Sequence, residues 1–280
     1  MHSGRAVHHS DRPPLTIVAS AGTLDTPAPR QRRALLCPVK LSRSPYIVPP
    51  STNGDAHAMS DDNKDMENTT PPVSPVYEAK ILFRQLKPFP VIDENNNFKI
   101  ETEHFLDSAN QIIDAIACFG KLFSPIVRDM RQNVQKITNK YNKNETLFKY
   151  LEDLILKDKD GNDNPFDTVT DGLLWLKRAF EMIEQFFRNV LEDETCSEQV
   201  KPHLKKAYEE CLLPYHGFVA QKAFQLLQLY LPSRTSLLGP ADSNMDNLKA
   251  LEEFLTLFRT NLNHLNEFYT KHDLHRTYKA

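Results

Sequence analysis

The sequence predicts an all-α fold, one helical domain that follows a disordered N-terminal extension. Apolar residues recur with a helical period from about residue 77 to residue 271, and no alternating period indicates a strand. Short connections between the helices favour a single domain. The first 75 residues are rich in Pro, Ser and Thr and lack a sustained apolar period. We therefore expect residues 1–75 to be disordered and residues 76–280 to form the domain.

The composition argues against several classes of function. A net charge of -3 over 280 residues provides no basic face for nucleic acid. The four cysteines form no CxxC pair and no glycine-rich phosphate loop is present, so we expect no metal and no cofactor. The loop at 158–165 is acidic, but it lacks the Glu that a calcium loop carries at its twelfth position. No run approaches the ~18 apolar residues of a membrane-spanning helix.

The N-terminal extension changes its charge along its length. It is rich in Arg and poor in acids up to residue 50, as in a mitochondrial transit peptide, but Pro13 and Pro14 interrupt any amphipathic helix there. After Met59 the sequence becomes acidic and polar. We hypothesise that Met59 is a usable start and that residues 1–58 are an extended or alternative leader. N-terminal sequencing of the native protein tests this, and a mature start well upstream of Met59 would refute it.

The helical period divides the domain into successive helices. A short helix is expected near 78–86, and Thr102 is expected to cap a helix that continues to about residue 120. In the next helix Ser124 is the expected cap and Pro125 the first helical residue, an arrangement that helices favour. That helix continues to about residue 141. Further helices are expected at 146–158, 168–193, 198–213, 216–231 and 243–271.

Three helices carry candidate binding residues. In the helix that begins near Ser124, a helical projection places Asp129, Asn133 and Lys136 on one polar stripe beside an apolar stripe that includes Ile126. By itself this stripe is more typical of a solvated face whose residues are neighbours at i, i+4 and i+7.

The helix around Trp175 is apolar over about half its circumference, which predicts a central helix or one that lines an internal space. Trp175 lies near the edge of the apolar arc, where one ring face is available to a ligand, although a lone Trp is more often part of a core. In the helix expected at 216–231, His216 lies within an apolar stripe, where a buried imidazole needs a hydrogen-bond partner. A structural core histidine is the alternative. On the opposite face Phe218 and Leu229 lie beside Lys222, a grouping that suits shallow contact with a membrane interface.

Three runs of residues resemble one known family. The segment Ser124–Lys136, the run Trp175–Arg178 and the segment Tyr215–Lys222 are similar to motifs of the glycolipid transfer proteins, in the same order and spacing. The resemblance covers about residues 78–280. It implies a two-layer sandwich of helices that encloses a hydrophobic pocket for ceramide chains, and a non-enzymatic transfer of glycosphingolipids between membranes.

The resemblance also implies roles for individual residues. Asp129, Asn133 and Lys136 would hydrogen-bond the first sugar, and Asp129 would also accept from the ceramide amide N–H. Trp175 would stack on the sugar ring and His216 would donate to the amide carbonyl. Tyr278, next to the chain end, would close over the headgroup. The apolar pocket would draw on Ile116, Phe119, Leu122, Ile126, Met182, Phe186 and Leu212.

Within the family, the residues at two positions of the site indicate which lipid headgroup is bound. Members that carry ceramide-1-phosphate have a cation where this chain has Asn133 and lack the aromatic residue where it has Trp175. We therefore expect a glycosphingolipid such as galactosylceramide, glucosylceramide or lactosylceramide. Two residues depart from the pattern: Phe218 replaces a Trp of many members, and Asp171 replaces a neutral or apolar residue, where it caps the helix or alters sugar preference.

The resemblance also sets expectations for the protein as a whole. We expect a cytoplasmic monomer that contacts a membrane surface transiently. A lipid sensor or adaptor that signals through the N-terminal extension, and a ceramide-1-phosphate carrier, are the alternatives. No paired carboxylates or nucleophile–base pair indicate an enzyme.

Overall fold

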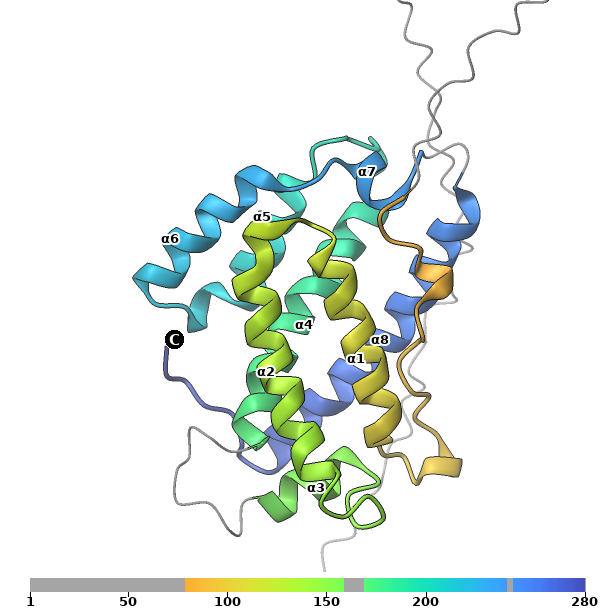
Figure 1. Ribbon diagram of the computed structural model, residues 1–280, viewed down its shortest axis with the longest axis vertical. Helices are drawn as coiled ribbons and strands as arrows, with labels where there is room; N and C mark the ends of the chain where they lie inside the picture. Colours follow the sequence, from red (N-terminus) through yellow and green to blue (C-terminus); the bar gives the residue numbers. More distant parts are fainter. Residues whose placement is uncertain (1–78, 159–168, 241–243, 280) are drawn as a thin grey trace, which may run out of the picture. The chain divides into compact units, whose positions relative to one another are not determined.

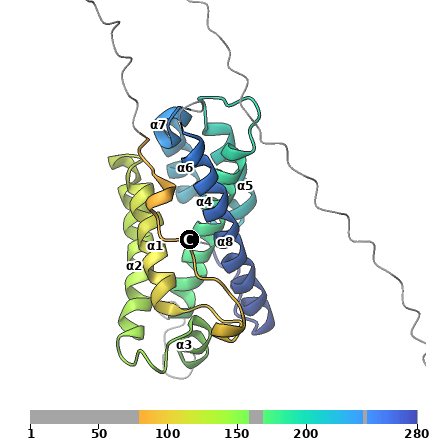
Figure 2. The same cartoon turned by 90° about the vertical axis from the view of Figure 1, so that its right-hand side faces the viewer.

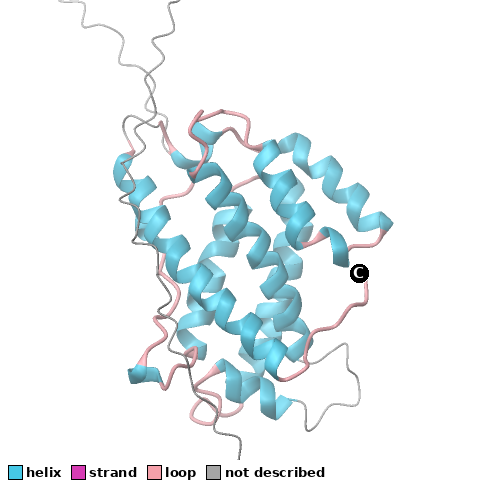
Figure 3. Cartoon of the chain, turned by 180° about the vertical axis from the view of Figure 1, so that it is seen from behind, coloured by secondary structure: helices cyan, strands magenta, loops and turns pink. Residues whose placement is uncertain are grey.

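The computed structural model describes residues 79–158, 169–240 and 244–279, which belong to one compact unit of the chain (Figure 1). The expected disordered segment 1–75, the start at Met59 and the loop after Asp158 lie outside the described residues. In the described part of the chain all regular structure is helical (Figure 3), and extended pairing is limited to one isolated bridge between Glu101 and Tyr150. The all-α fold predicted from the sequence is confirmed.

The helices form two layers, and α4 is central because it packs against helices of both. In Figure 2, α1 and α2 lie on one side, and α4, α5 and α8 lie on the other. Helix α4 packs against α2, α5 and α8, and α1 packs against α2. The α-helices of the described residues are α1 (Thr102–Ala117), α2 (Ser124–Tyr141), α3 (Leu151–Asp158), α4 (Val169–Leu191), α5 (Lys201–Cys211), α6 (Phe218–Leu227), α7 (Arg234–Leu238) and α8 (Met245–Lys271). The 3-10 turns are η1 (Phe83–Gln85), η2 (Glu94–Asn96), η3 (Lys121–Phe123), η4 (Leu213–Tyr215) and η5 (Gln228–Tyr230).

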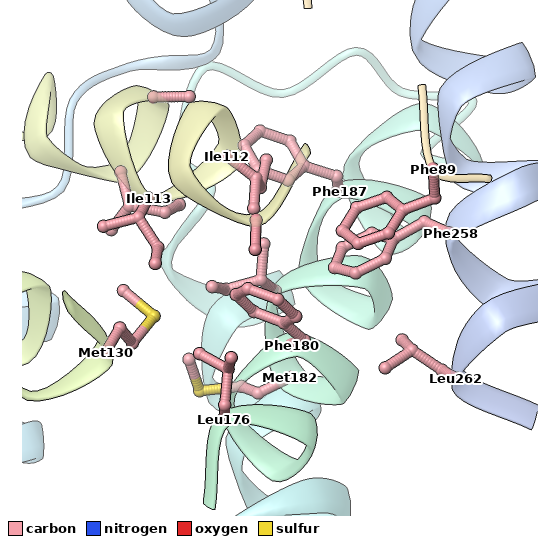
Figure 4. Packing of buried hydrophobic residues seen from close by; sticks show 14 of the residues in the cluster. Phe89, Ile112, Ile113, Met130, Leu176, Phe180, Met182, Phe187, Phe258 and Leu262 are labelled. Atoms are coloured by element: carbon pink, nitrogen blue, oxygen red, sulfur yellow. The ribbon is translucent and has the colours of Figure 1, made fainter. Parts of the chain in front are cut away.

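The core forms where the broad apolar face of α4 meets both layers. Phe180 and Phe187 of α4 are fully buried, as are Ile112 of α1 and Phe258 of α8. Figure 4 shows these side chains converging between the helices. Helix α4 can occupy this central place because its apolar residues cover enough of its circumference to bury it on more than one side.

An extended segment before α1 is held against α8. The ring of Phe89 stacks on that of Phe258 with a centroid distance of 4.3 Å. Asn261 of α8 donates to the carbonyl of Pro90 at 2.8 Å, and the Asn247 side chain accepts from the backbone N–H of Phe83 at 2.7 Å. The helix expected at 78–86 is therefore wrong except for the turn η1. Side chains of α8 pair with backbone groups that a helix would have paired internally.

Several helix boundaries also differ from the prediction. Thr102 is the first residue of α1 and not its cap, and its hydroxyl donates to the carbonyl of Phe148 at 2.7 Å. Ser124 likewise lies inside α2, because the turn η3 runs directly into that helix. Helix α3 begins only at Leu151, whose N–H donates to the carbonyl of Ile100 at 2.9 Å, so that the residues before it pair with the start of α1. Helix α7 was not predicted.

Candidate functional site

A cavity of about 490 Å³ lies between α1, α2, α4 and α5. Its walls come from both layers of the fold, from the segment that leads into α6 and from α6 itself. The lining residues are Ile116, Phe119, Phe123, Pro125, Ile126, Asp129, Met130, Asn133, Lys136, Asp171, Trp175, Ala179, Met182, Ile183, Phe186, Leu204, Leu212, His216 and Phe224. The cavity falls within the size range of small-molecule sites, and its lining combines an apolar majority with a few polar groups, as such sites do.

Most of the wall is apolar. The ring of Phe119 contacts two other rings of the wall, with centroid distances of 5.4 Å to Phe123 and 6.1 Å to Phe186. Figure 4 shows Met130 of α2 and Met182 of α4 approaching one another between their helices. Methionine is flexible and polarisable, so it adapts to apolar ligands of varied shape.

The structure brings six of the seven residues expected for the acyl pocket into this wall. Leu122 is the exception, because its side chain is 50 % exposed and does not line the cavity. It lies in the tight turn η3, whose geometry buries the next residue, Phe123, instead. The expectation for Leu122 is therefore wrong. Phe123 was missed, although its spacing of four residues from Phe119 was a visible signal.

The polar groups gather on neighbouring turns of α2 and α4. Asn133 is 8 % exposed, whereas Asp129 stays exposed at the edge of the cavity. Partial burial of its carboxylate raises the pKa of Asp129, and the charge of Lys136 opposes that rise. The close approach of the two helices depends on Gly172, because a Cβ atom there would lie 3.3 Å from Cδ of Lys136 and 3.4 Å from Oδ1 of Asn133. Gly172 was not singled out from the sequence.

The C-terminal segment contributes a hydrogen-bond relay. The Trp175 indole N–H donates to the Tyr278 hydroxyl at 3.1 Å, and that hydroxyl donates to the carboxylate of Asp171. Burial and the adjacent Asp171 carboxylate together raise the pKa of Tyr278, while the bond from Trp175 lowers it. Arg178 anchors the segment by donating to the carbonyl of Arg276. Tyr278 therefore lies beside Trp175, although it is not among the residues that line the cavity.

Trp175 is half-buried and surrounded by rings and a cation. Its ring is 6.4 Å from that of His216, with an angle of 25° between the planes, and 5.9 Å from that of Tyr278. The guanidinium of Arg178 lies 5.0 Å from the Trp175 ring and 3.6 Å from the ring of Tyr215. This packing holds the indole in one orientation at the cavity wall.

His216 lines the cavity, but its position differs from the predicted one. It has an extended backbone and precedes α6, which begins at Phe218. His216 is therefore not part of a helix, and the apolar stripe predicted around it does not form. Val219 is 81 % exposed instead of flanking it. The hydroxyl of Tyr208 lies 3.1 Å from His216 Nδ1, and burial lowers the pKa of the imidazole, which favours the neutral ring. Tyr208 as its partner was not predicted.

Helix α6 exposes apolar side chains along most of its length. Among its residues only Phe224 is buried, where it stacks on Tyr208 with a centroid distance of 3.7 Å. Phe218 is 72 % exposed and Leu229, in η5, is 61 % exposed. The ammonium of Lys222 lies 5.5 Å from the Phe218 ring centroid. We call Phe218, Val219, Leu226 and Leu229, with exposures of 57–81 %, the α6 surface.

Two features are absent from the described residues. No group of three or more His, Cys, Asp or Glu side chains there is arranged to hold a metal ion. Nor does that part of the chain contain a helix with the length and apolar character needed to cross a membrane.

Comparison with known proteins gives a consistent match. Residues 100–242 match the family model for glycolipid transfer protein. The chain is 29 % identical to the glycolipid transfer protein of Xenopus tropicalis over 211 residues, which cover 71 % of this chain and 99 % of that protein. It is 30 % identical to the glycolipid transfer protein of Danio rerio over 193 residues, covering 65 % and 92 % respectively.

Solved structures share the fold. A structure of FAPP2, which selects simple glycosphingolipids with the GLTP fold, superposes with a TM-score of 0.63 at 22 % identity and covers 71 % of this chain and 99 % of that one. The human ceramide-1-phosphate transfer protein in complex with its lipid superposes with a TM-score of 0.57 at 16 % identity, covering 70 % and 95 %. At these identities the superpositions establish the two-layer helical fold alone.

Proposed function

Because the chain belongs to the glycolipid transfer protein family, we propose that it carries single glycosphingolipid molecules between membranes and leaves them chemically unchanged. The observation that carries this proposal is the composition of one cavity: polar side chains of α2 and α4 adjoin apolar walls in the same space. A lipid with a hydroxyl-rich headgroup and hydrocarbon chains matches both parts. Burial of the chains provides most of the affinity, at ~0.8 kcal/mol per CH₂ group.

We propose that the headgroup is a neutral sugar. Asn133 offers both an acceptor and donors to hydroxyl groups, and the half-buried ring of Trp175 offers an aromatic face to the C–H surface of a sugar. A ceramide-1-phosphate carrier would require more cationic partners for its phosphate. Galactosylceramide, glucosylceramide and lactosylceramide are the expected ligands.

The amide of the ceramide needs paired partners, because an unpaired buried polar group costs about 1–3 kcal/mol. We propose that Asp129 accepts from the amide N–H and from a sugar hydroxyl, with Lys136 as a further sugar contact. If Tyr208 donates to Nδ1 of His216, the neutral imidazole carries its proton on Nε2, from which it donates to the amide carbonyl. Tyr278 then closes the headgroup end of the cavity.

The apolar chains would occupy the rest of the cavity. The proposed contacts of these chains are Ile116, Phe119, Ile126, Met182, Phe186 and Leu212.

The α6 surface is the proposed membrane contact. Phe218, Lys222 and Leu229 place apolar groups and a cation together, as interfacial helices do. His216 and Phe224 line the cavity next to this helix, so a lipid extracted at the α6 surface has a short path to the site. We further propose that the protein acts as a cytoplasmic monomer.

A vesicle-to-vesicle transfer assay with galactosylceramide, ceramide-1-phosphate and a diacyl phospholipid tests the proposal. Galactosylceramide should move fastest, and Trp175→Ala should slow its transfer at least about tenfold because the stacking face is lost. Asp129→Val should slow it similarly by leaving the amide N–H unpaired. Faster transfer of ceramide-1-phosphate would contradict the headgroup assignment. Tight lipid binding with negligible transfer would favour a sensor.

A further inference from the structure

An acidic side chain lies inside the cavity at a position outside the proposed headgroup set. Asp171 is in the first turn of α4, one helical turn before Trp175, and only 5 % of its surface is exposed. It lines the cavity together with Asn133 and Lys136. Its position on the same face of α4 as Trp175 directs it toward the space that a headgroup next to the indole would occupy.

The contacts of Asp171 connect it to the proposed sugar platform. Tyr278 donates to Oδ1 of Asp171 and accepts from the indole N–H of Trp175. Because the indole N–H donates to the Tyr278 hydroxyl and that hydroxyl donates in turn, the last group of the relay must be an acceptor, and the Asp171 carboxylate is one. A carboxylate accepts through two oxygens with about four lone-pair sites, so the bond from Tyr278 is compatible with a further bond from a ligand hydroxyl.

The cavity lining has more acidic than basic groups. Among the described residues, the charged side chains that line it are Asp129, Asp171 and Lys136. His216 also lines it, as an imidazole whose burial favours the neutral form. The nearby guanidinium of Arg178 lies against the rings of Tyr215 and Trp175 and is not part of the lining. An anionic headgroup would therefore meet two carboxylates and one ammonium in a partly desolvated space.

Building on the proposed function, we infer that Asp171 is a specificity-determining residue, which favours a neutral, hydroxyl-rich headgroup and rejects one that bears a sulfate or a phosphate. A sugar hydroxyl donates to the Asp171 carboxylate in a charge-assisted hydrogen bond. A sulfate or phosphate at the same place offers no such donor and is repelled by like charge, which water screens less inside a cavity than at the surface.

A purely structural role for Asp171 makes a different prediction. Acidic residues in the first turn stabilise a helix through its dipole, whether or not a ligand is nearby. Asp246 offers a matched control, since it lies in the first turn of α8, is exposed and does not line the cavity. If the dipole were the whole role of Asp171, Asp171→Asn and Asp246→Asn would both change stability and neither would change lipid choice.

The test measures lipid preference directly. Galactosylceramide, its 3-sulfate ester and ceramide-1-phosphate compete for the full chain against a fluorescent galactosylceramide, in the wild type, Asp171→Asn and Asp246→Asn. Trp175 is the single tryptophan of the chain, so its emission provides an independent readout of occupancy beside the indole. Thermal unfolding of each variant reports the structural contribution.

We expect the wild type to prefer galactosylceramide over its sulfate ester by roughly tenfold or more, as like-charge repulsion at an intermediate effective dielectric predicts. Asp171→Asn should reduce this ratio at least about fivefold, and Asp246→Asn should leave it unchanged. Equal wild-type affinity for the two glycolipids would overturn the inference without any variant, as would an unchanged ratio in Asp171→Asn. A wild type that binds galactosylceramide but moves none between vesicles would refute transfer alone, and the affinity ratio would still decide the role of Asp171.

Discussion

The α6 surface allows a quantitative prediction about membrane binding. Phe218 and Leu229 lie on this surface with exposures of 72 % and 61 %. If they enter the membrane interface, the double variant Phe218→Ala/Leu229→Ala should bind vesicles more weakly and transfer lipid more slowly. Its fold and its lipid cavity should be unaffected, because neither side chain lines the cavity.

The exposed fractions set the size of the effect. Full burial of a Phe or Leu side chain is worth about 1.5–3 kcal/mol. Because only part of each side chain is still exposed, insertion of Phe218 or Leu229 into the membrane interface would contribute roughly 1.5 kcal/mol to the binding free energy. The alanine methyl groups retain part of this gain. The double variant should therefore lose about 2 kcal/mol of membrane affinity, which corresponds to roughly thirtyfold in the partition coefficient.

Co-sedimentation with vesicles measures the partition coefficient, and competition with a fluorescent glycolipid checks that the cavity is intact. Phe98→Ala is the matched control, because Phe98 is 58 % exposed but belongs to the segment near η2, at the end of the helical body away from α6 (Figure 1). Unfolding free energies should stay within about 0.5 kcal/mol of wild type for both variants, as usual for exposed positions.

Two results would refute the reasoning. Vesicle binding of the double variant within about threefold of wild type would mean that these side chains do not insert, since the loss expected from their burial is tenfold larger. An equal loss in Phe98→Ala would show that general surface hydrophobicity, and not the α6 surface, drives binding.

Three further predictions concern stability and the site. Gly172→Val should lower the unfolding free energy by about 1–3 kcal/mol and weaken glycolipid binding, because the valine side chain would displace Lys136. Urea denaturation measures the loss of stability, and lipid competition measures the loss of binding. Burial lowers the pKa of His216 in the folded state, so the unfolded chain binds a proton at this imidazole more readily. The free energy of unfolding should therefore fall as the pH drops below about 6.5, by at most about 1.4 kcal/mol per pH unit. Urea titrations across this range should show a smaller fall in His216→Gln, and an equal fall would exclude His216 as the cause. Tyr269→Phe should cost about 1–3 kcal/mol, because the buried tyrosine hydroxyl donates to the carbonyl of Thr170 at 2.7 Å; a change below about 0.5 kcal/mol would show that the carbonyl finds another partner.

Helical periodicity was a good guide wherever a helix keeps one phase over several turns. The broad apolar face around Trp175 predicted a central α4, and α4 packs against helices of both layers. The stripe of Asp129, Asn133 and Lys136 depends only on the pitch of α2, and all three residues line the cavity. Because both statements concern spacing within one helix, no tertiary contact was needed to make them.

Periodicity failed where a helix boundary was misplaced. The argument for His216 assumed a helix that begins at residue 216, but α6 begins at Phe218. Residues that precede the first turn of a helix do not lie on any of its faces. The predicted reason for burial of His216, its place in an apolar stripe, is therefore wrong, although the residue does line the cavity. Leu122 failed for the same kind of reason, because the turn η3 changes the direction of successive side chains.

The residues of this chain by themselves determined the all-α class, the central helix and the polar stripe on α2, because each follows from the order of apolar and polar side chains along a regular helix. Only the tertiary structure decided what meets at the end of the cavity. Tyr278, Trp175 and Asp171 form a relay across about a hundred residues of sequence, and Gly172 sets how closely α4 approaches Asn133. Such contacts depend on how separate elements pack, and the local spacing of residues along one helix does not encode how elements far apart in the sequence meet.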